Sequence, residues 1–160
     1  MAESQPPVFD EEAGGDEVAV DEKGRVVVSK GLRERVGEPF VLGRGEVGCL
    51  ILYPRDEWNA LNAMVKKVDP WNPARRTFER LMVGGAQVGE TFDKQGRVLV
   101  PKDMREFAKL KDRARVIGIS GRVEVWASQE FAAYQNDPEG YNRERRESVE
   151  RAYWRLVGQA

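Results

Sequence analysis

One sequence motif occurs twice in this chain, 72 positions apart. The first copy spans Asp21–Glu34 and the second spans Asp93–Glu106, and eight of the fourteen aligned positions are identical. A second block, Gly48–Tyr53, aligns with Gly121–Trp126 at nearly the same offset. Self-similarity at a fixed spacing indicates repeated structural units. The sequence therefore predicts two copies of one small unit rich in β-structure.

The size of the repeat predicts that the two copies share one hydrophobic core. A unit of about 50 residues buries too little apolar surface to be stable alone. We therefore expect an α+β fold, mainly β, in which neither repeat is independent. The expected segments are a disordered acidic arm at 1–17, a first repeat at 18–64, a connecting helical segment at 65–87, a second repeat at 88–134 and a C-terminal helix at 138–157.

The apolar pattern and the turn residues predict the order of strands and helices. The expected strands are 18–20, 25–28, 40–42, 50–53, 88–92, 97–100, 115–119 and 123–126. The expected helices are 30–36, 55–68, 73–83, 102–110, one from residue 128 and a last one at about 141–157. Trp58, Trp126 and Phe131 fall on apolar stripes and are predicted core residues. Trp71 and Trp154 fit no stripe and are candidates for an interface.

The net charge of −1 conceals an uneven distribution of charge along the chain. Residues 1–17 contain six acidic residues and no basic residue, so the remainder has 26 basic and 21 acidic residues, a balance of +5. DNA binding requires a local basic surface, which a whole-chain total can hide. The composition is therefore compatible with a nucleic-acid partner.

Each copy of the motif predicts a tight turn between two strands. The side chains of Asp21 and Asp93 can accept hydrogen bonds from backbone N–H groups two residues on, and Gly24 or Gly96 can adopt a left-handed conformation. Turn chemistry does not explain the arginine that follows the glycine in both copies. A guanidinium can form paired hydrogen bonds with phosphate or with the edge of guanine. The repeated arginine therefore favours DNA contact over a solvated surface charge.

Four further cations also recur in the two copies: Lys30, Arg33, Lys102 and Arg105. They either widen the basic surface or form helix-face ion pairs with Glu34 and Glu106, and the sequence does not favour one interpretation over the other.

Several functional classes are disfavoured by composition. The chain has no histidine, so the commonest general base and the commonest metal ligand are missing. The single cysteine, Cys49, lies in an apolar strand and is predicted to be a buried hydrophobe, which suits a reducing compartment. No apolar run is long enough to span a membrane, and the N-terminus lacks the pattern of a signal peptide. We expect no enzyme activity, no cofactor, no metal site and no small-molecule substrate.

The ordered set of motifs resembles the MraZ family of bacterial transcriptional regulators, which consist of two tandem SpoVT-AbrB repeats. The resemblance rests on the two Asp-x-x-Gly-Arg turns, on Cys49–Pro54 with Glu57-Trp58, on Ala74–Phe78 and on Gly121–Trp126. It covers about residues 18–134. Two departures are Ser29, where the second copy has Pro101, and an N-terminal arm that is longer and more acidic than usual in the family.

The resemblance implies an interlocked, pseudo-two-fold β-barrel with peripheral helices. It further implies a ring-like homo-oligomer, cytoplasmic and nucleoid-associated, that binds direct-repeat boxes in double-stranded DNA upstream of the division and cell-wall gene cluster, usually as a repressor. The DNA contacts implied by the resemblance lie in the two turns, at Lys23, Gly24, Arg25, Lys94, Gln95, Gly96 and Arg97.

Two other interpretations remain open at this point. One is an AbrB-type antitoxin, whose C-terminal tail would wrap a partner toxin. The other is an oligomeric assembly module that binds no DNA, in which the turns serve only as turns.

Overall fold

The computed structural model describes residues 16–144, together with 147, 151 and 155. Residues 1–15 of the predicted acidic arm and most of the predicted helix at 141–157, including Trp154, lie outside the described residues. Asp16 and Glu17, which were expected to belong to the disordered arm, instead lie in a strand. Within the described part, the elements follow the predicted order, and their ends lie within two residues of the expected positions. The exception is the helix expected at 73–83, which is divided into an α-helix, Pro73–Phe78, and a π-helical turn, Glu79–Val83.

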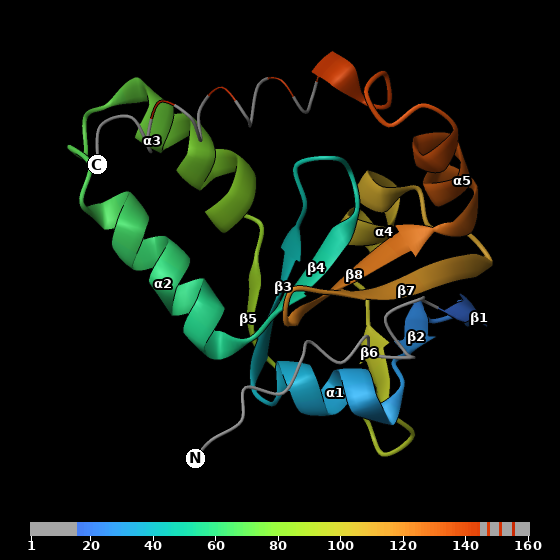
Figure 1. Ribbon diagram of the computed structural model, residues 1–160. Helices are drawn as coiled ribbons and strands as arrows, with labels where there is room; N and C mark the ends of the chain where they lie inside the picture. Colours follow the sequence, from blue (N-terminus) through green and yellow to red (C-terminus); the bar gives the residue numbers. More distant parts are fainter. Residues whose placement is uncertain (1–15, 145–146, 148–150, 152–154, 156–160) are drawn as a thin grey trace, which may run out of the picture.

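Strands and helices alternate along the chain in two similar series (Figure 1). The strands are β1 (Asp16–Ala19), β2 (Arg25–Val27), β3 (Phe40–Arg44), β4 (Leu50–Tyr53), β5 (Gln87–Glu90), β6 (Arg97–Leu99), β7 (Arg113–Ile119) and β8 (Arg122–Ala127). The helices are α1 (Lys30–Val36), α2 (Arg55–Lys66), α3 (Pro73–Phe78), the single π-helical turn η2 (Glu79–Val83), α4 (Lys102–Ala108) and α5 (Ser128–Asn136).

The two repeats exchange strands. Six strands form one antiparallel sheet in the order β1-β7-β8-β4-β3-β5, and β2 pairs with β6 in a separate two-stranded ribbon. The first strand of the first repeat, β1, therefore pairs with β7 of the second repeat, and β5 of the second repeat pairs with β3 of the first. The order is symmetric about the β8–β4 pair at its centre, which gives the fold a pseudo-two-fold axis.

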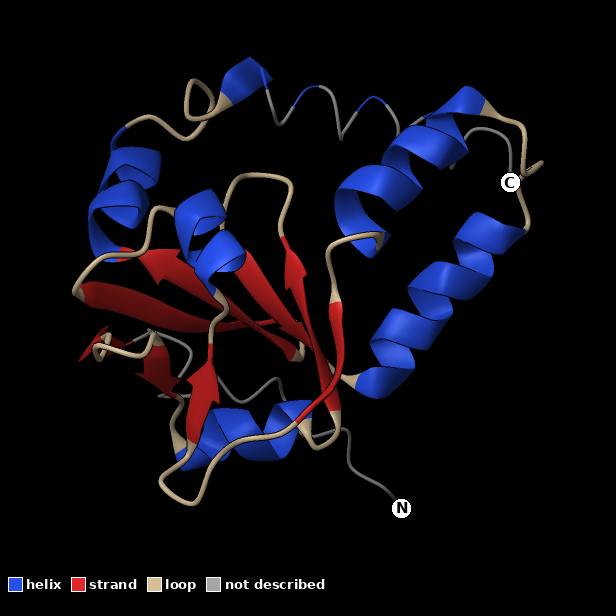
Figure 2. Cartoon of the chain, turned by 180° about the vertical axis from the view of Figure 1, so that it is seen from behind, coloured by secondary structure: helices blue, strands red, loops and turns tan. Residues whose placement is uncertain are grey.

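The expected closed barrel is not present among the described strands. Instead, the six-stranded sheet is open, with β1 and β5 as its edges (Figure 2). The β2–β6 ribbon is joined to β1 by one isolated bridge, between Val20 and Val26. The ribbon otherwise covers the sheet through side chains, since Val26 and Val98 are completely buried. The ribbon is therefore joined to the sheet mainly by side-chain packing and not by a continuous ladder of backbone hydrogen bonds, so the strands do not form a closed barrel.

The main hydrophobic core draws equally on both repeats, which confirms the expected shared core. Its central members include Val26 and Val28 from the first repeat and Val98 and Val100 from the second, each no more than 1% exposed. Full burial of an aliphatic side chain of this size contributes about 1.5–3 kcal/mol. Since these residues contact one another across the repeat boundary, removal of one repeat would expose the core of the other.

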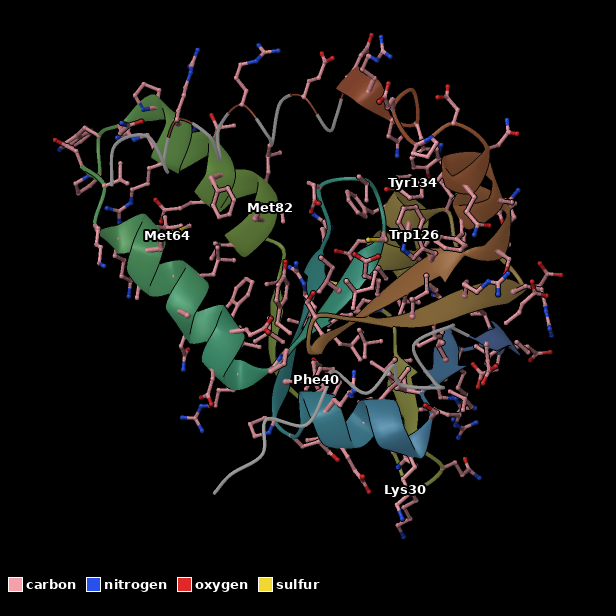
Figure 3. All side chains as sticks on the ribbon, in the orientation of Figure 1. Lys30, Phe40, Met64, Met82, Trp126 and Tyr134 are labelled. Atoms are coloured by element: carbon pink, nitrogen blue, oxygen red, sulfur yellow. The ribbon has the colours of Figure 1, made fainter. Side chains whose placement is uncertain are left out.

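The opposite side of the sheet carries a second, aromatic cluster. Trp126 packs against Tyr134 with ring centroids 5.1 Å apart, and Figure 3 shows the two side by side. Cys49 is 1% exposed, as expected for a buried hydrophobe, and burial raises the pKa of its thiol well above the ordinary value. Burial likewise raises the pKa of Tyr53 to about 12. Trp58 is also buried, so both tryptophans predicted for the core are found there.

Helices α2 and α3 form a helical hairpin beside the sheet, apart from α4 and α5 (Figure 1). Asn72 caps α3, and its side chain accepts a hydrogen bond from the backbone N–H of Ala74. Trp71 at the tip of the hairpin is 75% exposed, in agreement with its lack of an apolar stripe, and the guanidinium of Arg76 lies 4.4 Å from its ring centroid.

Candidate nucleic-acid interface

The first turn (Asp21–Arg25) is held by the side chain of its leading aspartate. Oδ1 of Asp21 accepts hydrogen bonds from the backbone N–H groups of Lys23 (3.0 Å) and Arg25 (2.8 Å). Its other oxygen, Oδ2, accepts a hydrogen bond from Nε of Arg25. Gly24 adopts a φ of +83°, the left-handed conformation that glycine tolerates best. The aspartate thus fixes both the backbone of the turn and the arginine that follows it.

The second turn (Asp93–Arg97) repeats this geometry. Oδ1 of Asp93 accepts from the N–H groups of Gln95 and Arg97, both at 2.9 Å, and Oδ2 accepts from Nε of Arg97 at 2.8 Å. Gly96 has a φ of +75°. The motif predicts the roles of Asp and Gly in both turns, whereas nothing in it indicates the ion pair between the aspartate and the arginine of each turn.

The β2–β6 ribbon brings the two turns together. Val26 lies opposite Val98 with their side chains in the core, so Arg25 and Arg97 belong to the other, outward face of the ribbon. On that face Arg25 lies opposite Leu99, which is 54% exposed, and Arg97 lies opposite Val27, which is 44% exposed. Nη1 of Arg97 also reaches Oδ2 of Asp21 in the first turn, at 3.4 Å. Both turn arginines therefore share one exposed surface.

The turn carboxylates are stabilised in their ionised form. The pKa values of Asp21 and Asp93 lie below the ordinary aspartate value, chiefly because each accepts the backbone N–H of its turn arginine and also the guanidinium. A guanidinium has five N–H donors. Within the described part of the chain, Arg25 uses Nε and Arg97 uses Nε and Nη1 in these bonds. Donors therefore remain on both side chains for a further acceptor.

A second pair of arginines packs on the glycines of the turns. The guanidinium of Arg105 on α4 lies against Gly24, where an added Cβ would fall 2.5 Å from Nη1. The guanidinium of Arg33 on α1 lies against Gly96 in the same way, with Cζ 2.8 Å from such a Cβ. Each repeat thus supports the turn of the other. No local sequence signal could have indicated this contact, because it joins residues more than 60 positions apart.

Each of the two interpretations of the four recurring cations therefore holds for one pair of them. The lysines form the helix-face pairs, with Lys30 3.9 Å from Glu34 and Lys102 3.9 Å from Glu106. Lys30 points away from the body of the protein in Figure 3, and both lysine side chains are 82% exposed. The arginines instead lie at the turns and add positive charge there.

The structure places the seven expected contact residues in three environments. Lys23, Lys94 and Gln95 are exposed, the two arginines are partly buried, and the two glycines are buried beneath the arginines of the opposite repeat. The described residues contain no group of three or more histidine, cysteine or carboxylate side chains placed to hold a metal ion. None of the described helices has the length and apolar character needed to cross a membrane.

Strand exchange between two repeats, with an arginine-bearing turn from each on one ribbon, defines a class of duplicated, interlocked β-proteins. Comparison with known families gives the particular one. The family model of the MraZ protein, whose description likens it to antitoxins, matches this chain twice, at residues 13–81 and 82–152. The chain belongs to the MraZ family of transcriptional regulators.

Three relatives named transcriptional regulator MraZ illustrate the similarity. The protein from Pelotomaculum thermopropionicum is 41% identical over 117 residues, which cover 73% of this chain and 80% of the relative. The protein from Alkaliphilus oremlandii is 40% identical over 119 residues, covering 74% and 82%. The protein from Desulfitobacterium hafniense is 39% identical over 120 residues, covering 75% and 83%. All three relatives are named as transcriptional regulators and not as enzymes.

Proposed function

We propose that this chain is a sequence-specific regulator that binds double-stranded DNA through its two turns. The observation that carries the proposal is the β2–β6 pairing, which brings Arg25 and Arg97 onto one outward face. A two-stranded ribbon has dimensions that fit the major groove of B-DNA. The family membership supports the same conclusion, since the relatives are named as transcriptional regulators.

The proposed contacts divide between bases and backbone. Arg25 contacts a guanine edge, because its neighbour Lys23 is exposed at the tip of the turn and can take the adjacent phosphate. In the second turn Lys94 and Gln95 form the exposed tip, and Arg97 contacts either a base or a phosphate. Gly24 and Gly96 contribute through the left-handed turns that they permit and through the arginine of the opposite repeat that packs on each of them.

The proposed assembly is a ring-like homo-oligomer in the cytoplasm, associated with the nucleoid. One ribbon carries few cations, so a single contact with DNA is weak. Several ribbons bound to spaced boxes gain affinity through effective concentration. The proposed operator is a set of direct repeats upstream of the division and cell-wall gene cluster, where binding represses transcription.

Titration of fluorescent DNA tests this function. The fragments carry the region upstream of the chain's own gene, with one box or with two, and light scattering reports the size of the assembly. We expect tight binding to two boxes, weaker binding to one, and a large loss of affinity in Arg25→Ala and Arg97→Ala. If both variants bind like the parent, the turns are structural only, and the assembly-module interpretation replaces this one.

A further inference from the structure

A groove lies beside the first turn, between that turn and the end of α4. It has a volume of about 490 Å³, and four cations line it: Lys102, Arg105, Lys109 and Lys111. We propose that this basic groove binds the phosphate backbone of DNA alongside the first turn. The proposal rests on the proposed function and adds a contact site that belongs to neither turn.

Three carboxylates, those of Asp21, Glu22 and Glu106, also line the groove, so they offset its four cations only in part. Asp21 lines the groove, but it is already paired with Arg25 and Arg97 of the turns. Glu106 lies 3.9 Å from Lys102, and both side chains are largely exposed to solvent. Exposed pairs of this kind contribute little, so a phosphate can displace the carboxylate at small cost.

The backbone of Lys109 supports a functional role for its side chain. Lys109 ends α4 in the left-handed conformation, with a φ of +55°. The residue that ends the equivalent helix α1 is Gly37, with a φ of +71° and a ψ of 179°, which is a different conformation at positive φ. Glycine adopts the left-handed conformation of Lys109 freely, whereas a lysine is strained in it. Strain of this kind persists where the side chain contributes something that glycine lacks.

The ion pair that Lys109 forms within the protein does not account for that strain. Its Nζ lies 3.4 Å from Oε1 of Glu130, whose side chain is 18% exposed, but the lysine side chain is 58% exposed, so its ammonium group is still accessible to a phosphate. The left-handed lysine is better explained by the positive charge that it places beside the first turn, where Arg105 already covers Gly24.

The basic groove has no basic equivalent at the end of α1. There Gly37 and Pro39 occupy the positions of Lys109 and Lys111, and the residue between them is Glu38. The additional phosphate contacts are therefore expected on the side of the first turn only.

The test measures DNA affinity at a series of salt concentrations for the full chain and for Lys109→Gly. Two double-stranded fragments of equal length are used, one from upstream of the chain's own gene and one of unrelated sequence. Loss of one phosphate contact should lower affinity for both fragments about tenfold at ~0.1 M salt, and should flatten the slope of log K against log salt by about one unit. The melting temperature should stay the same or rise, because glycine relieves the left-handed backbone.

Matched variants separate the groove from general charge effects. Lys111→Ala alone should also flatten the slope of log K against log salt by about one unit relative to the parent. Lys109→Arg should retain the parent slope. Lys66→Ala removes the same charge from exposed α2, outside the groove, and should leave the slope unchanged.

The outcomes also distinguish the groove from the proposed function. If the parent binds no upstream DNA, both proposals are overturned. If the parent binds and depends on Arg25 and Arg97, while Lys109→Gly and Lys111→Ala keep the parent slope, only the basic groove is overturned.

Discussion

The first and second turns have nearly the same internal hydrogen bonds, but they differ in the residues that surround them. In both, an aspartate accepts two backbone N–H groups and one arginine Nε, and a left-handed glycine lies beneath an arginine of the other repeat. Outside, Asp21 is shared by two arginines, and the basic groove adjoins the first turn. The backbone of such a turn depends on its aspartate and its glycine. Its binding properties depend on the neighbouring side chains, which can differ between the two turns while the fold stays the same.

The largest expected effect concerns the internal contacts that the two turns share. Gly24→Val and Gly96→Val should each lower the free energy of unfolding by more than about 2 kcal/mol, because the new side chain meets both a left-handed backbone and a packed guanidinium. Urea unfolding measures this loss. Gly89→Val is the control with the same replacement, since Gly89 has a φ of +78° with nothing within 4 Å of an added Cβ, and it should cost less because no packed guanidinium is displaced. Equal losses in all three variants would show that the guanidinium contact contributes nothing.

The next effect concerns binding. Arg25→Ala should weaken operator binding by about 1–3 kcal/mol and relax specificity at one base pair, as expected for loss of a bidentate guanine contact. Fluorescence anisotropy with operators changed one base pair at a time measures both quantities. Arg25→Lys keeps the charge but loses the bidentate geometry, so it should show the same loss of specificity. A uniform loss across all operators would instead assign Arg25 to a phosphate.

A smaller effect should distinguish the two arginines in stability. Arg97 pairs with the carboxylates of both turns, while Arg25 pairs with Asp21. Arg97→Ala should therefore lower the melting temperature more than Arg25→Ala, though by a few degrees at most, because these pairs are partly solvated. Differential scanning calorimetry at low and high salt checks this order, and the difference should shrink as salt screens the pairs. The opposite order would contradict the shared role of Asp21.

The smallest effect is the dependence of stability on pH. The folded-state pKa values of Asp21 and Asp93 are lowered, so each carboxylate contributes stability above its ordinary pKa, and that contribution is lost as the pH falls through the folded value. Stability should therefore fall below about pH 4, near the ordinary aspartate pKa. Urea unfolding from pH 6 to lower pH should show a shallower decline in the double variant Asp21→Asn with Asp93→Asn. Parallel curves would contradict a role for these carboxylates.

The sequence predicted local features of this fold well. Asp21, Gly24 and their counterparts define each turn through contacts within five residues, so the motif alone contains the necessary information. The exposed position of Trp71 likewise follows from the local apolar pattern. The order of strands and helices was predictable for the same reason, because periodicity and turn residues act over short distances.

Features that depend on contacts between the repeats were less predictable. Whether the edge strands β1 and β5 close a barrel depends on tertiary packing, and here the ribbon covers the sheet with Val26 and Val98 instead. The contact of Arg105 with Gly24 joins residues of different repeats, and no spacing in the sequence encodes it. The motif indicated that these arginines recur, but their position on the turns required the exchanged fold.

The exchange of β1 and β5 has a consequence for orientation. Two separate copies of one repeat could exchange strands in the same way, as a symmetric dimer with identical halves. Such a dimer would look the same from both ends of a DNA site and would match an inverted sequence. In this protein both halves lie in one polypeptide, so one half can gain Lys109 and Lys111 while the other keeps Gly37 and Pro39. Covalent linkage therefore makes the two ends of the molecule different. Under the proposed function, this polarity suits binding sites that all run in the same direction along the DNA.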